Sequence, residues 1–355
     1  MPYKCLEIVS GLGMGGAEKT FLDRIFWAPK NLETKIIDTI PGLLAWDLPS
    51  GISYTACPRR SLGYLKRLCS QIDAFAPHVV VVRTPLDLIT LACLKRFSSH
   101  NWKLIYEAHS TKLSQSKFIA LFLMPLHRVA IKASGLVVAV SKSVSEGEQC
   151  LGSKNLAVHY FGAAARTRDD VQSKDLSFIF VGRFVALKQP LLLLEAIEEV
   201  YKILQESRVT VSFIGKGPLE GEIREYVEKN KLDEVVKIVG FVSDLNSIYS
   251  KSDYLISTSK FEGLPITFFE AKQHGLRVIT TPSSGDFDVL GDEDEILPNF
   301  SRRSISEALV SAIKGGKLTP EERRSIQVKN RWMSADVCAK KYYKLIEAQI
   351  SQSAS

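Results

Sequence analysis

Short runs of aliphatic and β-branched residues recur along the chain, and segments with helical spacing separate them. The clearest runs are His78–Arg83 (HVVVVR), Lys103–His109 and Leu136–Ser141, which are apolar almost throughout. Strands of this kind are buried on both faces, as in a parallel sheet that is covered by helices. Ser61–Phe75 and Leu86–Phe97 have helical spacing. The pattern therefore predicts an α/β protein built on doubly wound parallel sheets.

The length and one break in the pattern predict two domains. The chain has 355 residues, and a domain typically has about 100–200. Between Gly162 and Lys174 the pattern gives way to small and charged residues (AAARTRDDVQSK), which are typical of a linker. The rhythm restarts at Leu176–Val181. We expect a first domain over residues 1–165 and a second over residues 175–333.

Charge and cysteine content exclude several classes of protein. The formal net charge of +7 is modest and no long Lys/Arg run occurs, so anionic partners are compatible but not specified. No helix-turn-helix, zinc-finger or aromatic ribonucleoprotein pattern is present, so we expect no nucleic acid partner. The six cysteines have no C-x-x-C spacing, which indicates reduced thiols. Without a signal peptide or an apolar run of about 18 residues, a cytoplasmic protein is expected.

The stretch from Asp253 to Gly285 carries the most chemical information. It reads as a strand (Tyr254–Ser259), a loop with Gly263 and Pro265, a helix (Ile266–His274) and a second strand. Pro265 suits the first turn of a helix, because its missing N–H is no loss there. The free amides of residues 263–267 then gather at a helix N-terminus beyond the carboxyl end of a strand. This geometry predicts an anion site.

Two carboxylates flank this predicted anion site. Glu262 precedes the turn and Glu270 lies one turn into the helix. A carboxylate there can accept hydrogen bonds from two neighbouring hydroxyls, such as those of a ribose. The alternative is that Glu262 is solvated and Glu270 stabilises the helix start through the macrodipole.

At these residues the chain resembles a known family. F-E-G-L-P-x-x-x-x-E-A followed by H-G-L-R-V-I-T-T is similar to the Glu-x7-Glu signature of retaining glycosyltransferases of family 4. The resemblance implies the GT-B fold, in which two Rossmann-like domains face a cleft. It implies that Glu270 holds the ribose of a sugar nucleotide and that Glu262 lies beside the transferred sugar. The sugar and diphosphate would contact Gly263, Leu264, Pro265, Ile266 and Thr267.

The first loop of the second domain carries two cations. Arg183 and Lys188 flank a strand-to-helix turn and could clamp a diphosphate, Arg183 bidentately and Lys188 as a point charge. Both could equally be solvated surface charges. Their R-x4-K spacing resembles the donor-phosphate pair of the family, which implies that they stabilise the leaving nucleoside diphosphate without a metal or other cofactor.

Two further loops of the second domain resemble the nucleotide-binding loops of the family. The first is G-x-G-P, which begins at Gly215. The second contains Phe241 and Val242, which by resemblance pack against the base. The alternative for Phe241 is a place in the hydrophobic core. Downstream, Asp292-Glu-Asp294 fits a D-x-D pattern without supporting context, so we expect a solvated turn there.

The opening loop allows a different function. Glycines 11, 13 and 16 fit the dinucleotide fingerprint G-x-G-x-x-G, and the next strand ends in Asp38. This supports the alternative of an NAD(P)-dependent oxidoreductase. The G-G-A-E sequence also resembles the first loop of the same transferases, where Gly15 and Gly16 would approach the donor diphosphate. A tight strand-to-helix turn would explain the glycines without a ligand.

The remaining expectations concern the acceptor side. His109 ends its strand at the ligand edge; a lone His is often structural, but by resemblance it contacts the donor sugar or acceptor. Lys117–Lys132 combines apolar and basic residues and is either a core helix with a kink at Pro125 or an amphipathic face on anionic lipid. A second basic cluster, Arg59, Arg60, Lys66 and Arg67, also allows peripheral membrane contact.

The resemblance to this family implies a retaining transfer of a hexose-type sugar from a UDP or GDP sugar to a hydroxyl. The acceptor, lipid-linked or oligosaccharide, would bind the first domain, as in cell-surface polysaccharide or glycolipid assembly. By resemblance, residues 334–355 form a helix that crosses back to the first domain. A catalytically inactive GT-B scaffold is the other alternative, although Arg183, Lys188, Glu262 and Glu270 are all present.

Overall fold

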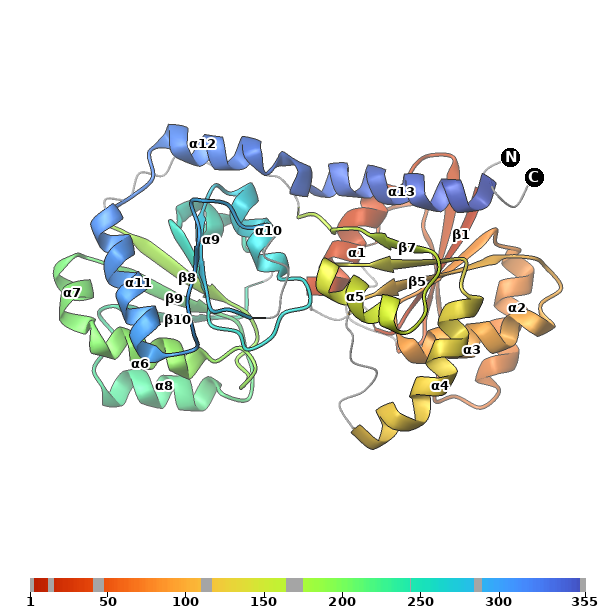
Figure 1. The fold of residues 1–355 in the computed structure, drawn as a ribbon, viewed down its shortest axis with the longest axis horizontal. Helices are drawn as coiled ribbons and strands as arrows, with labels where there is room; N and C mark the ends of the chain where they lie inside the picture. Colours follow the sequence, from red (N-terminus) through yellow and green to blue (C-terminus); the bar gives the residue numbers. More distant parts are fainter. Residues whose placement is uncertain are drawn as a thin grey trace. The chain divides into compact units, whose positions relative to one another are not determined.

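The computed structural model describes residues 3–11, 16–40, 48–109, 117–163, 175–242, 244–283 and 289–351; side chains 16, 17, 117–122 and 150 are outside the description. The chain forms two compact units (Figure 1). Unit 1 comprises Met1–Gly162 and Ala335–Ser355, and unit 2 comprises Ala163–Ser334. Most of the predicted linker, residues 164–174, lies outside the described residues.

Unit 1 is built on a parallel sheet with strand order β3-β2-β1-β4-β5-β6-β7. The strands are β1 Tyr3–Val9, β2 Leu32–Asp38, β3 Ser53–Ala56, β4 Val79–Val82, β5 Lys103–Ala108, β6 Leu136–Ala139 and β7 Leu156–Val158. The helices are α1 Gly16–Phe26, α2 Tyr64–Phe75, α3 Pro85–Leu94, α4 Lys117–Ala133, α5 Lys142–Cys150 and α13 Ala335–Ser351. The strand order reverses direction between β1 and β4, which is where ligands bind in such sheets.

Unit 2 repeats the architecture with a parallel sheet ordered β10-β9-β8-β11-β12-β13. The strands are β8 Ser177–Val181, β9 Thr210–Ile214, β10 Val236–Gly240, β11 Tyr254–Ser257, β12 Arg277–Thr280 and β13 Glu295–Ile296. The helices are α6 Pro190–Glu199, α7 Tyr201–Glu206, α8 Glu220–Lys229, α9 Asn246–Lys251, α10 Ile266–Gln273, α11 Arg302–Gly315 and α12 Pro320–Lys329. The prediction of two α/β units with doubly wound parallel sheets is confirmed.

The sequence pattern identified the buried strands because their side chains are enclosed on both faces. All four valines of β4 are fully buried, and Phe178, Phe180 and Phe213 meet in the core of unit 2. Phe180 and Phe213 stack with ring centroids 5.4 Å apart. The short edge strands β3, β7 and β13 were not predicted, and the residues of β13 are exposed. Edge strands lack the continuous apolar run that marks a central strand.

Two arginines and two glutamates form a buried charge cluster in unit 1. Arg24 contacts Glu107 and, at 3.1 Å, Glu7, while Arg83 binds Glu7 at 2.7 Å and Glu107 at 2.8 Å. The charges balance, so the cost of desolvation is offset by direct pairing. Burial alone would raise the pKa of Glu107, but Arg24 and Arg83 hold it well below the ordinary value.

The C-terminal helix α13 belongs to unit 1 and lies against α1 (Figure 1). Tyr342 of α13 donates a hydrogen bond to Glu107, and its ring lies 3.9 Å from the Arg24 guanidinium carbon. The neighbouring Tyr343 donates to the Arg24 carbonyl oxygen over a longer distance of 3.4 Å. The charge cluster therefore anchors the last helix of the chain to the first sheet.

The turn predicted to be solvated, Asp292–Asp294, is partly a buried ion-pair site. Lys272 of α10 is fully buried and binds Glu293 at 3.0 Å and also Asp294. Asp294 further accepts hydrogen bonds from the amides of Val278 and Gly291 at 2.7 and 2.8 Å. The prediction was wrong because the partner cation lies about 20 residues upstream, where no local pattern points to it. The turn therefore fixes α10.

The helix α4 has one buried and one exposed face among its described side chains. His127, Ala130 and Ile131 are buried, whereas Leu126 and Val129 are exposed beside the exposed basic residues Arg128 and Lys132. The sequence left open a core helix or an amphipathic one, and residues 123–133 are amphipathic. Among the described residues, no helix has the length and apolarity needed to cross a membrane.

We predict that Tyr342→Phe destabilises unit 1 by about 1–3 kcal/mol, because the buried Glu107 carboxylate loses a donor. Tyr343→Phe is the matched control and should cost less than about 1 kcal/mol, since its hydrogen bond is long. Hydrogen exchange of the β5 amides, read by mass spectrometry, measures the local effect. Equal protection in the two variants would contradict this role of Tyr342.

Candidate functional site

The loops after β8 and β11 are fastened to each other at the carboxyl edge of the second sheet. The hydroxyl of Thr258 donates to the carbonyl oxygens of Lys188 and Gln189, both at 2.9 Å. The amide of Lys260 donates to the carbonyl oxygen of Leu187 at 2.8 Å. Gln189 has a left-handed backbone (φ 49°) that turns the chain into α6. These hydrogen bonds, here termed the loop clip, bring two predicted site segments together although about 70 residues separate them.

The loop clip places Lys188 next to Glu262. The Lys188 ammonium forms an ion pair with Glu262 Oε1, and the two side chains are 23% and 11% exposed. The sequence predicted Lys188 as a phosphate ligand and Glu262 as a neighbour of the sugar, and the structure joins them. Arg183, the second predicted cation, is exposed in the same loop. No side chain or backbone group among the described residues forms a hydrogen bond or ion pair with the Arg183 guanidinium.

The start of α10 provides amides beside this ion pair. Pro265 is the N-cap residue, and its carbonyl accepts from the Phe268 amide at 2.9 Å. The helix begins at Ile266 as predicted, but Pro265 lies just before the first turn and not inside it. Gly263, Leu264, Ile266 and Thr267 are all half-buried in this turn. The amides of Gly263, Leu264, Ile266 and Thr267 therefore lie around a helix N-terminus, which attracts anions.

Glu270 projects from α10 into a buried setting. Its side chain is 8% exposed, and Oε2 accepts a hydrogen bond from the Tyr249 hydroxyl at 2.8 Å. Burial and the neighbouring Glu270 raise the pKa of Tyr249 well above its ordinary value. The Tyr249 ring stacks on His274, with centroids 5.4 Å apart. Tyr249 thus holds the Glu270 carboxylate, a contact that sequence reasoning missed because no motif marks a tyrosine in α9.

Glycines allow the β8 and β9 loops to pack closely. A Cβ atom on Gly215 would lie 1.9 Å from the Gly182 carbonyl oxygen, and Gly215 has φ 148°. A Cβ on Gly217 would lie 2.3 Å from the Phe184 carbonyl oxygen. The amide of Gly182 donates to Ile214 at 3.0 Å, which completes the contact. The Gly215 loop is therefore a support for the loop that carries Arg183 and Lys188.

The loop after β10 presents an aromatic ring at the same edge. Phe241 is 39% exposed, so the alternative of a core position is wrong. The ammonium of Lys216 lies 6.0 Å from its ring centroid. The adjacent Val242 is half-buried. A flat, exposed ring at the edge of a sheet suits contact with a planar base.

The remaining predicted residues lie in unit 1. His109 follows β5, stacks on Phe161 with centroids 5.6 Å apart, and lies 3.7 Å from Glu107 through Nε2. Gly15 lies outside the described residues, and Gly16 is the first residue of α1. Asp38 is fully buried and accepts from the amides of Gly11 and Ile40 at 3.1 and 3.0 Å. The Asp38 carboxylate therefore holds the loops after β1 and β2 by hydrogen bonds to their amides, and it is not exposed for contact with a ribose.

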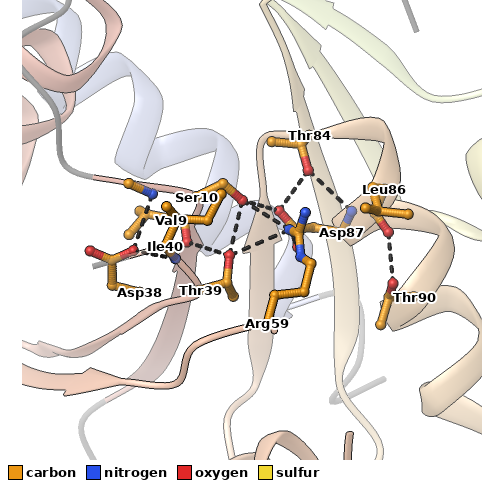
Figure 2. Close-up of polar contacts among 11 residues, drawn as sticks. Val9, Ser10, Asp38, Thr39, Ile40, Arg59, Thr84, Leu86, Asp87 and Thr90 are labelled. Carbon is orange, nitrogen blue, oxygen red and sulfur yellow. Dashed lines mark hydrogen bonds and ion pairs between the residues drawn. The ribbon is translucent and has the colours of Figure 1, made fainter. Parts of the chain in front are cut away.

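Sequence reasoning missed a polar cluster at the carboxyl edge of the first sheet (Figure 2). Asp87 accepts from the hydroxyls of Ser10 and Thr84, both at 2.6 Å, and pairs with Arg59. Arg59 also donates to Ser10 at 3.1 Å and approaches Thr39 at 3.4 Å. These side chains follow β1, β2, β3 and β4, so the cluster fixes the ends of four neighbouring strands. The cue in the sequence was a polar residue after each strand.

Comparison with known structures defines the fold class. The chain superposes on HepE from Anabaena, solved in complex with UDP, with a TM-score of 0.82 at 15% identity, covering 97% of this chain and 100% of HepE. The two units thus have the GT-B fold of glycosyltransferases.

Comparison of sequences finds similarity mainly in the second unit. Residues 164–331, which lie in unit 2, match the family described as glycosyl transferases group 1. The chain is 29% identical over 112 residues to the capsular polysaccharide biosynthesis glycosyltransferase CapH of Staphylococcus aureus, 31% of each chain. It is 26% identical over 161 residues to the amylovoran biosynthesis glycosyltransferase AmsD of Erwinia amylovora, 45% of each chain. These matches span less than half the length of both curated relatives.

We predict that Gly215→Ala destabilises unit 2 by about 2–3 kcal/mol, because the added methyl group overlaps the Gly182 carbonyl. Gly221→Ala is the control: nothing lies within 4 Å of its Cβ position, and Gly221 is inside α8. That substitution should stabilise by about 0.5–1 kcal/mol. Thermal unfolding measures both, and a neutral Gly215→Ala would show that the two loops are not tightly packed.

Proposed function

We propose that this protein is a retaining glycosyltransferase that moves a hexose-type sugar from a nucleoside-diphosphate sugar to a hydroxyl acceptor. The observation that carries the proposal is the grouping of Arg183, Lys188, Glu262 and the α10 amides at one edge of the second sheet, with Glu270 on the same helix. The match of this unit to glycosyl transferases group 1 supports it. The curated relatives in polysaccharide biosynthesis favour a role in cell-surface polysaccharide or glycolipid assembly.

Each part of the donor has a matching group in unit 2. Arg183, Lys188 and the backbone N–H groups at the start of α10 would bind the diphosphate through charge-assisted hydrogen bonds. Glu270, held by Tyr249, would accept hydrogen bonds from the ribose hydroxyls. Phe241 and Val242, together with the Gly215 loop, would contact the base. We infer a UDP or GDP sugar, and HepE, which has the same fold, is described in complex with UDP and with UDP-glucose.

The proposed chemistry relies on charge stabilisation of the leaving group. The bond between the anomeric carbon and the phosphate oxygen breaks, and the acceptor oxygen bonds to the same face of that carbon. The leaving phosphate takes the acceptor proton. Arg183 and Lys188 supply the positive charge that the departing diphosphate needs. We assign no metal and no carboxylate nucleophile to this step; Glu262 would contact the transferred sugar, and His109 the donor sugar or the acceptor.

The acceptor would bind unit 1 at the carboxyl edge of its sheet, where Arg59 and its polar neighbours lie. For a lipid-linked acceptor, a nearby membrane surface is needed. The exposed leucines Leu62 and Leu65 alternate with the exposed cations Arg60, Lys66 and Arg67. This combination of apolar and basic residues suits peripheral contact with the inner face of an anionic membrane from the cytoplasm.

An NAD(P)-dependent oxidoreductase is disfavoured by the position of Asp38. In dinucleotide-binding proteins the acidic residue after the second strand binds the ribose. Here its carboxylate is fully buried and binds the amides of Gly11 and Ile40 and the Tyr54 hydroxyl. An inactive scaffold would need neither the Lys188–Glu262 ion pair nor the exposed Arg183 in the same loop as Lys188.

We predict that Lys188→Met and Arg183→Met each weaken nucleoside diphosphate binding about ten- to hundredfold, as expected for loss of a hydrogen bond between charged groups. Lys251→Met is the control, because Lys251 is exposed at the end of α9, ahead of β11 and away from the carboxyl edge. Titration calorimetry with UDP, GDP and ADP measures the effect. If the wild type binds none of the three, or if all three variants bind like the wild type, the donor-site assignment is wrong.

We predict that Arg60→Ala together with Lys66→Ala weakens binding to anionic vesicles about thirtyfold, since each cation near such a surface contributes roughly 1 kcal/mol. Vesicles of phosphatidylglycerol and phosphatidylcholine, tested by sedimentation at low and high salt, give the measurement. Lys202→Ala with Lys251→Ala removes two exposed cations from unit 2 and should leave binding unchanged. A similar loss in both double variants would indicate that only net charge matters.

A further inference from the structure

The ion pair between Lys188 and Glu262 joins two groups that the proposed reaction needs separately. We propose that Glu262 competes with the ligand phosphate for Lys188. The nucleotide sugar displaces Glu262 from Lys188 and gives its carboxylate new hydrogen bonds, whereas the free nucleoside diphosphate displaces it without replacing them. In this role Glu262 makes the site prefer the donor over the product. The inference rests on the proposed function, because it assumes that a diphosphate binds at Lys188.

The pair is held in place by the backbone and not by two mobile side chains alone. The loop clip fixes the main chain on both sides of Lys188, through Thr258 at 2.9 Å and Lys260 at 2.8 Å. Neither charged group is more than a quarter exposed. Partial burial reduces screening by solvent, so the attraction is stronger than in a fully exposed ion pair.

Because the Lys188 ammonium is already paired with Glu262, a diphosphate that binds Lys188 must displace the Glu262 carboxylate. Arg183 and the α10 amides attract the phosphates without such an exchange. The Glu262 carboxylate, once displaced, lies next to the incoming negative charge and repels it unless it finds new donors. A buried or half-buried carboxylate without a donor is costly, so the fate of Glu262 decides how tightly the ligand is held.

The sugar supplies the donors that the displaced carboxylate requires. Sugar hydroxyls next to the β-phosphate can donate hydrogen bonds to Glu262, so the donor substrate satisfies both Lys188 and Glu262. A free nucleoside diphosphate satisfies only Lys188. After sugar transfer, Glu262 loses its hydroxyl partners and pairs again with Lys188, which promotes release of the diphosphate product. The same carboxylate therefore serves sugar recognition and product release.

Glu262→Gln tests this role, because the amide keeps the shape of the side chain and removes the charge. We expect free UDP or GDP, whichever the wild type binds, to bind the variant about fivefold more tightly. The matching nucleotide sugar, UDP-glucose or GDP-mannose, should bind no more tightly than to the wild type. The ratio of the two affinities should therefore fall at least fivefold. Titration calorimetry without acceptor gives both values.

Two controls separate the pair from general electrostatics. Glu222→Gln removes one exposed carboxylate in the first turn of α8, at the same edge of the sheet but outside the ion pair. It should leave the affinity ratio unchanged. In a Lys188→Met background, Glu262→Gln should tighten binding of the free diphosphate clearly less than in the wild-type background, because the competition for Lys188 is gone and only the repulsion by the carboxylate remains.

The outcomes are distinct. Tighter diphosphate binding in Glu262→Gln that is clearly smaller in the Lys188→Met background supports the inference. Unchanged or weaker diphosphate binding in Glu262→Gln overturns the inference, although the proposed function stands. Equal tightening with and without Lys188, or equal tightening in Glu222→Gln, overturns it as well. If the wild type binds neither UDP nor GDP nor their sugars, the donor assignment fails and this inference falls with it. Thermal unfolding without ligand confirms that each variant is folded.

Discussion

The hydrogen bonds of the loop clip are the interaction on which the candidate site depends. Because β8 and β11 are neighbours in a parallel sheet, their carboxyl ends emerge side by side, and Thr258 and Lys260 then fasten the two loops together. Lys188, Glu262 and the start of α10 acquire fixed positions as a result. Gly215 lets the loop after β9 pack against the loop after β8, because a Cβ atom at this position would lie 1.9 Å from the Gly182 carbonyl oxygen. Charge is thus arranged by backbone contacts before any ligand binds, which favours tight and selective binding.

The two units use ion pairs for different purposes. In unit 1, Arg24 and Arg83 are enclosed with Glu7 and Glu107, and the balanced cluster secures α13 to the sheet. Arg24, Glu7 and Glu107 are at most 3% exposed, so their pairs are hard to exchange, because a separated charge would remain in an apolar interior. In unit 2, Lys188 and Glu262 are partly exposed, so water and ligands can reach them. A partly exposed pair can be exchanged for a phosphate and a sugar, and this difference in burial separates the structural cluster from the functional one.

Much of this arrangement was predictable from local sequence. The apolar runs gave the central strands, and the Glu262–Glu270 stretch gave the loop and helix of the second unit, with Pro265 one position from its expected place. What the sequence did not reveal were pairings between distant residues. The Lys188–Glu262 pair, the Tyr249–Glu270 hydrogen bond and the buried partners of Lys272 each join segments at least about 20 residues apart. The exposure of Phe241 also depended on tertiary packing, because an aromatic residue after a strand suits either a core or a surface.

The central claim is that unit 2 holds the diphosphate of a nucleotide sugar between Arg183, Lys188 and the start of α10. A crystal structure with UDP or GDP bound tests it most directly. The account predicts phosphate oxygens within hydrogen-bond distance of both cations and of backbone amides among Gly263, Leu264, Ile266 and Thr267, with the ribose at Glu270. A nucleotide bound instead at the loop after β1, or at a site that leaves Lys188 and Arg183 without phosphate contacts, would contradict it.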